Sequence, residues 1–298
     1  MKLRKYDDTD ASSLVDLLNL CFPQKKITMD TFLWKHFDGF FQNRSACYVA
    51  EDTQTICSFV CFTPMDIQLH HTTRRFYSCA VQATHPEYRR QGWVTQLTQL
   101  VEKELGVNTE YIGFSNSDGV KIDINSKKIN YAIVGQLYTR YVPSFPNIPT
   151  IQIVKTNTPE VSFLDCPYLS VHKPDAYISW RYGRNEKGHY EYFSLSKNNQ
   201  VIGSLICRTK KYRFEVKELL ISSPHPEEYN EAIKSFANYS FFHGKFLVSY
   251  TYLDSVFWQH VFPTISRTRT IPIFLTVKST DPETKNPDNW FIQGGDIQ

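Results

Sequence analysis

Residues 77–105 hold the pattern that most constrains the fold: a short apolar strand, a basic turn that contains glycine, and an amphipathic helix. The segment 77–84 is mostly apolar or small and is bounded by the His-Pro pair at 85–86, which favours a central strand over a helix start. In the segment 93–105 the apolar side chains recur with the 3.6-residue period of a helix that buries one face. The pattern therefore predicts a strand that enters a helix through a short basic turn.

The turn has the composition of an anion-binding site. It reads Arg-Arg-Gln-Gly-Trp-Val over residues 89–94. A helix that begins here presents unpaired backbone N–H groups and the positive end of its dipole, and Gly92 lets a bound anion come close to the chain. Arg89 and Arg90 add two cations at the same place. We expect the turn to hold a phosphate group; the alternative is an ordinary connection whose arginines face water.

This strand, turn and helix resemble the cofactor motif of the GNAT superfamily, the acyl-CoA-dependent N-acyltransferases. The family pattern Gln/Arg-x-x-Gly-x-Gly/Ala is met by Arg89 and Gly92, whereas Val94 stands where a small residue is usual. A further apolar strand is expected at residues 111–115, after the helix. The resemblance implies an α/β (α+β) fold with a mixed, mostly antiparallel twisted sheet flanked by helices.

The resemblance also implies acetyl-CoA as co-substrate and names the residues that would bind it. The turn amides and arginines would hold the pyrophosphate. The strand before the turn would diverge from its neighbour, so that its free backbone groups bind the pantetheine arm and polarise the thioester carbonyl. Asn116 would bond the CoA arm, or cap the next helix instead. The predicted cofactor-binding residues are Val81, Gln82, Ala83, Arg89, Arg90, Gln91, Gly92, Trp93, Val94 and Asn116.

The base that deprotonates the amine is not singled out by the sequence. An alkyl ammonium has a pKa near roughly 10 and needs a proton acceptor at neutral pH. The candidates near the ends of the strand are Asp66, His85 and Glu87, and surface polarity explains each of them equally well.

The acid that protonates the leaving thiolate is also undefined. Ser126 stands where the family often has a tyrosine, which leaves Tyr131 and Tyr138 as substitutes, with packing as the alternative for both. The ending Trp-Phe-Ile-Gln-Gly-Gly-Asp at 290–296 resembles the closing strand of two-part GNAT proteins of surface-polysaccharide pathways. Asp296 is therefore a candidate for orienting the amine; a polar tail is the alternative.

The order of elements recurs in the second half of the chain. A Trp-basic pair occurs at 34–35 and again at 180–181, and a similar series of strands and helices follows each. The first series has strands at 46–51, 55–62, 77–84 and 111–115 with helices from 93 and near 120–128; the second has strands at 190–196, 201–208, 214–222 and 246–251 with helices at 227–242 and 255–262.

We therefore expect tandem GNAT-like domains at residues 1–145 and 160–298, joined by a proline-rich extended linker within 143–159. The second copy reads Ser-Ser-Pro-His-Pro-Glu at 222–227, without the arginine and glycine of the first turn. Only the first domain is thus expected to bind CoA. The alternative is an unrelated α+β second domain.

The composition of the chain argues against several other classes of protein. A net charge of +3, with basic residues in scattered pairs, argues against nucleic acid as a partner. No apolar run approaches the roughly 18 residues of a membrane span. The seven cysteines are odd in number and lie mostly in apolar runs, which favours a reducing cytoplasm. His70 and His71 have no evident third ligand, so no metal site is expected.

These observations lead to one main hypothesis and two alternatives. The main hypothesis is an acyltransferase that moves an acetyl group from acetyl-CoA to the primary amine of a small molecule, an amino sugar or sugar nucleotide. The first alternative keeps the chemistry and changes the acceptor to a protein or antibiotic amine. The second is a CoA-binding module without turnover.

Overall fold

The computed structural model describes residues 1–37, 40, 45–69, 72–116, 131–158, 167–183, 190–223, 225–262, 265–294 and 296–297. Its strands are β1 (Lys2–Lys5), β2 (Ala46–Asp52), β3 (Thr55–Leu69), β4 (Thr72–Thr84), β5 (Glu110–Asn116), β6 (Ala132–Pro143), β7 (Gln152–Thr156), β8 (Leu169–Val171), β9 (Tyr190–Lys197), β10 (Gln200–Thr209), β11 (Arg213–Ile221), β12 (Leu247–Leu253), β13 (Arg267–Lys278) and β14 (Trp290–Phe291). Its helices are α1 (Ala11–Cys21), α2 (Met29–His36), α3 (Trp93–Leu105), α5 (Asp175–Gly183), α6 (Pro226–Phe242) and α7 (Val256–Val261), with 3-10 turns at Asp8–Asp10, Pro86–Tyr88, Pro282–Lys285 and Pro287–Asn289.

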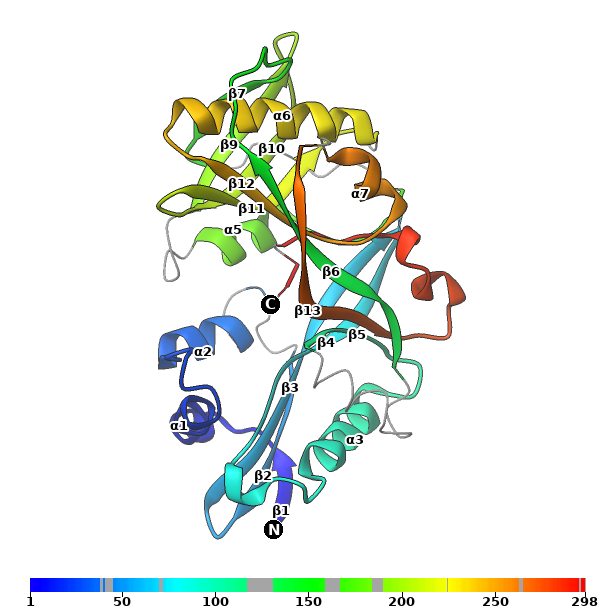
Figure 1. Cartoon of the computed structure of the whole chain (residues 1–298). Coiled ribbons are helices and arrows are strands. Elements are labelled where there is room, and N and C mark those ends of the chain that lie inside the picture. The colour runs from blue at the N-terminus through cyan, green and yellow to red at the C-terminus, as the bar shows by residue number, and fades with distance from the viewer. Residues whose placement is uncertain are drawn as a thin grey trace.

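All of these strands belong to one sheet that runs the length of the molecule. Its main path is β1-β2-β3-β4-β5-β13-β6-β12-β11-β10-β9-β7, and β8 with β14 is attached beside β3. The pairs are antiparallel except β4 with β5, β11 with β12, and β8 with β14. The expected mixed, mostly antiparallel sheet flanked by helices is confirmed (Figure 1).

Two long strands at the centre join the halves. β13 comes from the second half of the chain but pairs with β5 of the first, and β6 comes from the first half but pairs with β12 of the second. β6 and β13 also pair with each other, and both cross the middle of the molecule in Figure 1. Each half of the sheet is therefore completed by a strand from the other half.

The predicted order of elements in the second half is confirmed by β9, β10, β11, α6, β12 and α7. The linker prediction is wrong for its last part, because Gln152–Thr156 forms β7 and pairs with β9 at the sheet edge. The four prolines that indicated a linker leave this five-residue stretch free of proline, so its backbone donors remain available for a ladder. The helix expected near 120–128 lies outside the described residues.

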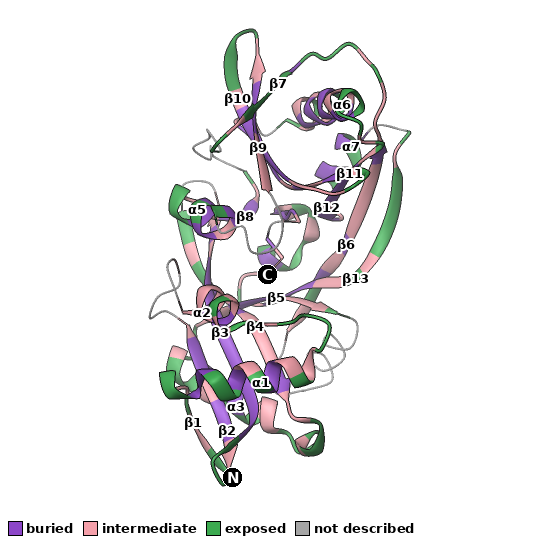
Figure 2. Cartoon of the chain, turned by 90° about the vertical axis from the view of Figure 1, so that its left-hand side faces the viewer, coloured by how far each residue is buried: buried purple, intermediate pink, exposed green. Residues whose placement is uncertain are grey.

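Helices cover both faces of the first half of the sheet. α1 and α2 pack on one face through Leu14 and Phe32, and α3 packs on the other through Leu97 and Val101. Buried residues follow β2 and β3 between these helices in Figure 2. In the second half, α6 and α7 pack against the sheet around Phe236. Among the described helices, none is long and apolar enough to cross a membrane.

The two Trp-basic pairs of the sequence meet in space. The indole N–H of Trp34 in α2 donates to the carbonyl of Trp180 in α5, and the indole N–H of Trp180 donates to the carbonyl of Trp34, both at 3.1 Å. The ring centroids are 5.4 Å apart. The repeated sequence motif therefore forms a nearly symmetric contact between the two halves.

Candidate functional site

The strand before the basic turn diverges from its parallel neighbour. β4 pairs with β5 only from Phe76 to Ser78, opposite residues 110–112. Beyond this point Val81, Gln82 and Ala83 ladder with β3 alone among the described strands, while the end of β5 pairs with β13. We call this divergence, residues 79–84 of β4 and 113–116 of β5, the first fork.

A β-bulge marks the start of the first fork. Cys61 of β3 lies opposite Val81 and Phe62 lies opposite Cys79, so that Ala80 is the extra residue in β4. A bulge increases the local twist and bends its strand. The bend carries β4 away from β5 and leaves one backbone edge of β4 facing the gap.

The basic turn follows directly after the first fork. Gly92 has φ +77° and is the N-cap residue of α3, and among the described residues no side chain caps the first amides of the helix. Arg90 also has a positive φ, of 64°. Residues 89–92 are exposed, and within the described part of the chain a Cβ built on Gly92 would meet no atom within 4 Å. The helix N-terminus is therefore open to solvent and flanked by two cations.

Some side chains around the turn form hydrogen bonds, and others pack against the core. Arg89 Nε donates to the carbonyl of Thr84 at 3.2 Å, and the indole N–H of Trp93 donates to Gln91 Oε1 at 3.2 Å. Trp93 and Val94 pack against the core below α3. The large residue at 94 thus contributes to packing, while the backbone amides around it keep the helix N-terminus available.

The other predicted residues near the first fork lie on separate sides of it. Asn116 is exposed at the end of β5. Tyr131 packs on the α3 side of the sheet, with its ring 6.3 Å from that of Tyr111. Tyr138 lies on β6 and stacks on Tyr252, against the core of the second half. The structure therefore does not bring the two candidate tyrosines together. Ser126 lies outside the described residues.

The three candidate bases differ in their partners. Asp66 accepts two hydrogen bonds from the guanidinium of Arg75, at 2.7 and 3.0 Å. His85 Nδ1 accepts the backbone N–H of Glu87 at 3.4 Å, at the start of a 3-10 turn. Glu87 itself is exposed.

The second half contains the same kind of divergence, which we call the second fork, residues 217–221 of β11 and 251–253 of β12. β11 pairs in parallel with β12 only over residues 213–216. A β-bulge again follows, because Ile206 lies opposite Glu218 and Cys207 opposite Val216, with Lys217 as the extra residue. Counted from the two bulges, Leu219 of β11 corresponds to Gln82 of β4.

The chain's own C-terminal segment fills the second fork. Gln293 pairs with Tyr252 of β12 through an isolated bridge. On the other side, its carboxamide bonds both backbone groups of Leu219: Oε1 accepts the N–H at 2.8 Å, and Nε2 donates to the carbonyl at 3.3 Å. Gly294 follows, where a Cβ would lie 3.2 Å from Thr251 Cβ. The segment thus bonds to both strands of the second fork.

Asp296, expected to orient an amine, is fully buried beneath this segment. Its carboxylate accepts the Gln293 N–H at 2.8 Å and lies 2.7 Å from Nζ of Lys173. Lys173 is also 2.7 Å from Glu218, which accepts the hydroxyl of Tyr182 at 2.6 Å. These interactions anchor the end of the chain to β11 and α5.

The charged groups in this buried cluster shift one another's pKa values. Burial by itself lowers the pKa of Lys173, but the carboxylates of Asp296 and Glu218 outweigh it and raise that pKa. Burial and the neighbouring Asp296 raise the pKa of Glu218 against the opposing effect of Lys173. Sequence reasoning missed Gln293, Lys173 and Glu218, since nothing in their local pattern shows that distant segments bring them together.

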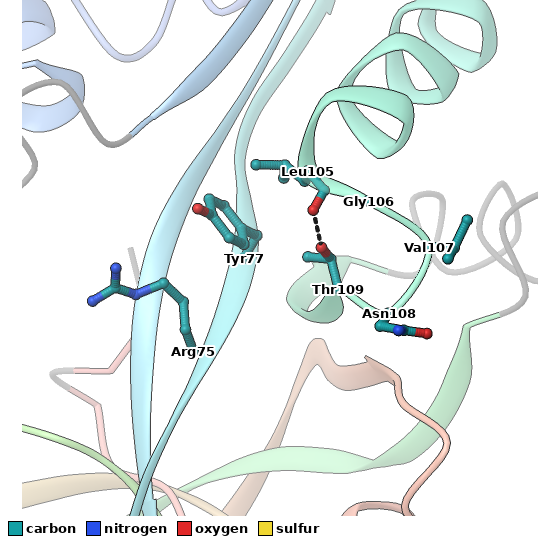
Figure 3. A pocket seen from close by; sticks show the side chains of 7 residues that line it. All are labelled: Arg75, Tyr77, Leu105, Gly106, Val107, Asn108 and Thr109. Carbon is teal, nitrogen blue, oxygen red and sulfur yellow. Dashed lines mark hydrogen bonds between the residues drawn. The ribbon is translucent and has the colours of Figure 1, made fainter.

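A separate cavity of about 550 Å³ lies at the opposite end of α3 from the turn (Figure 3). Arg75 and Tyr77 of β4 line it together with residues 105–109, and Thr109 Oγ1 donates to the Leu105 carbonyl at 2.7 Å. This is the carbonyl end of the helix, where the dipole disfavours anions. The cavity is therefore distinct from the predicted phosphate site.

Comparison with known proteins agrees with this geometry. Residues 2–112 match the model of the acetyltransferase (GNAT) domain. No curated protein sequence matches the chain. A structure from Enterococcus faecalis V583, of a conserved protein of unknown function and probable N-acyltransferase, is similar with a TM-score of 0.71 and 14% identity, over 95% of this chain and 73% of that one.

Two further structures are GCN5-related N-acetyltransferases. The one from Anabaena variabilis has a TM-score of 0.67 and 13% identity, over 94% of this chain and 73% of that one. The one from Kribbella flavida has a TM-score of 0.63 and 12% identity, over 94% and 71%. At these identities the likeness establishes the fold. Residues 2–112 are therefore similar to the acetyltransferase (GNAT) domain, and the expected acyltransferase class agrees with this match.

Proposed function

We propose that the chain is an N-acetyltransferase that moves an acetyl group from acetyl-CoA to the primary amine of a small molecule, and that the first fork is its cofactor site. The observation that carries this proposal is the first fork itself, which ends in an open, cationic helix N-terminus. The first fork can bind an extended polar chain, and the helix N-terminus beside it can bind a diphosphate. The GNAT domain match over the same residues supports it.

The residues present fit such a ligand. The free edge of β4 at Val81, Gln82 and Ala83 can bond an extended pantetheine chain as a neighbouring strand would. The amides at 92–94 and the arginines can bond the pyrophosphate. When bound, acetyl-CoA supplies an activated acyl group. A backbone N–H at the bulge would then stabilise the charge that develops on the thioester oxygen.

The acceptor that we propose is an amino sugar or sugar nucleotide. Two features support it: the resemblance of the chain's ending to two-part GNAT proteins of surface-polysaccharide pathways, and an aromatic content of 15%. We further propose that the halves are tandem GNAT-like units that exchanged β6 for β13, because each strand completes the sheet of the other half. The cysteine content supports a cytoplasmic location.

The test is thiol release from acetyl-CoA with pooled amines, together with CoA binding by calorimetry. The double variant Arg89→Ala, Gly92→Val removes one cation and imposes a side chain at a positive φ, so we expect CoA affinity to fall at least about tenfold. Lys103→Ala, on the exposed face of α3, is the matched control and should bind as the wild type does.

Each outcome separates the alternatives. Unchanged CoA affinity in the double variant would show that the turn is not the cofactor site. CoA binding without thiol release across the amine panel would indicate a module without turnover. Release that requires peptides, and not free amino sugars, would move the acceptor to a protein amine.

A further inference from the structure

Four aromatic side chains are exposed at one end of the second half, far from the first fork in the sheet order. Tyr212 is 55% exposed, Phe241 44%, Phe242 70% and Phe246 67%. Large apolar side chains at a protein surface are usually scattered singly, and a group of them marks an interaction site.

These side chains belong to two adjoining turns. Tyr212 lies in the connection from β10 to β11, and Phe241 to Phe246 span the end of α6 and the turn into β12. The backbone N–H of Phe246 donates to the Tyr212 carbonyl at 2.9 Å, and their rings stack with centroids 6.2 Å apart. The rings of Phe241 and Phe242 are 5.4 Å apart. In Figure 1 the end of α6 and the start of β12 lie on the same side of the molecule.

Three lysines, Lys210, Lys211 and Lys245, lie in the same two turns. Lys211 Nζ is 4.9 Å from the Tyr212 ring centroid. Lys245 Nζ donates to the carbonyls of Lys210 and Lys211, at 2.9 and 3.4 Å. We call Lys210, Lys211, Tyr212, Phe241, Phe242, Lys245 and Phe246 the aromatic–lysine patch.

The positive charge of this patch is not neutralised by ion pairs. Across the described part of the chain, no ion pair joins any of the three lysines to a carboxylate. The acids closest in sequence and sheet order, Glu215 and Glu191, are bonded to Arg213 and Lys155 instead. Lys211 is exposed, whereas Lys210 and Lys245 are half-buried and the Lys245 ammonium is bonded to backbone carbonyls. The patch therefore presents apolar rings beside one exposed lysine and two half-buried ones.

We propose that the aromatic–lysine patch docks the protein on an anionic phospholipid membrane. Aromatic rings enter the headgroup level of a bilayer, and lysines extend their ammonium groups to the lipid phosphates. The positive charge of the patch favours an anionic membrane over a second copy of the chain as the binding partner. A two-fold contact through the patch would place its lysines opposite one another, which is repulsive.

The experiment is flotation of the full chain with vesicles of phosphatidylcholine alone or with about 30 mol % phosphatidylglycerol, an anionic surface. We expect binding to the anionic vesicles and weaker binding as salt is raised. Phe242→Ser with Phe246→Ser should reduce the partition coefficient at least about tenfold through lost apolar contact. Lys211→Glu should reduce it at least about fivefold through lost attraction.

Matched controls lie in the first half. Val107→Ser changes an apolar side chain that is 99% exposed, and Lys103→Glu reverses an exposed charge on α3. Both should bind vesicles within about twofold of the wild type, because they leave the proposed contact intact. Circular dichroism and thermal unfolding of each variant show whether it is folded.

Three results would overturn the proposal. The first is a wild-type chain that floats with neither vesicle, or equally with both. The second is an equal effect of the control and patch variants. The third is a concentration-dependent dimer in sedimentation velocity that Phe242→Ser with Phe246→Ser abolishes, which would assign the patch to self-association.

Discussion

The two forks of this sheet start from the same geometry and end in different states. Each follows a parallel strand pair that separates at a β-bulge, at Ala80 in β4 and at Lys217 in β11. The first fork leads into the open N-terminus of α3 beside two arginines. The second is occupied by Gln293 and is followed by a turn without arginine or glycine.

This difference separates what the fold supplies from what binding requires. A diverging strand pair leaves backbone donors and acceptors on one edge, and buried backbone groups must find partners. In the second half the carboxamide of Gln293 meets that need for Leu219. A ligand amide would meet it in the first half. The same structural feature is therefore a core contact in one half and a candidate binding site in the other.

The largest expected effect comes from the buried charges that anchor the C-terminal segment. Lys173→Met leaves Glu218 and Asp296 buried without their cation. Removing one member of a buried ion pair costs about 3–5 kcal/mol, so urea unfolding should show a loss of that size. Lys197→Met breaks a solvent-accessible pair with Glu231 and should cost far less, because water already screens that pair. Equal costs would mean that burial does not decide the outcome.

The next effect tests the first fork through ligand binding. A ligand that binds only the native state stabilises it by about 2.7 kcal/mol at a concentration 100 times its Kd. Saturating CoA should raise the unfolding free energy of the wild type and of Gln293→Ala by this amount. The double variant Arg89→Ala, Gly92→Val should gain much less at the same CoA concentration. Loss of the CoA effect in Gln293→Ala would place the ligand in the second fork.

A smaller effect is expected from opening the second fork. Gln293→Ala removes both partners of the Leu219 backbone, and unsatisfied buried groups cost about 1–3 kcal/mol. Gln293→Met keeps most of the volume but not the hydrogen bonds, and it should be nearly as unstable. Gln82→Ala, at the corresponding position of the first fork, should change stability by less than about 0.5 kcal/mol. Thermal unfolding of the three variants decides this; a stable Gln293→Met would contradict the role of the bonds.

Short-range sequence patterns were sufficient to predict the helices and strands whose periodicity or bounding residues lie within a short window. The helix at Trp93–Leu105, the turn before it, and the strands β9 to β12 all show their period or punctuation within a short window. The exchange of β6 and β13 is not visible in this way, because strand partners are chosen by long-range packing. β7 was missed for a related reason: a five-residue edge strand has little periodicity, and prolines surround it.

The residues of the candidate site also differ in whether the local sequence was sufficient to predict them. The glycine and arginines of the turn are recognisable because a helix N-terminus and its anion contacts are formed by neighbouring residues. Gln293 and Leu219 are separated by 74 positions, and their contact depends on the whole second half being folded. Asp296 was predicted to orient an amine, with a polar tail as the alternative, and only the structure shows its burial and its ion pair with Lys173.

The smallest expected effect tests how far the symmetry of the two halves extends. Trp34 and Trp180 exchange equal hydrogen bonds of 3.1 Å, although the forks beyond them differ. Trp34→Phe and Trp180→Phe each remove one indole donor to the other residue's carbonyl and retain an aromatic ring at the contact. Each should therefore cost about 1 kcal/mol, with a difference below about 0.5 kcal/mol, in urea unfolding. A much larger cost for one of them would show that the contact is symmetric in geometry but not in energy, and that the specialisation of the halves already begins at α2 and α5.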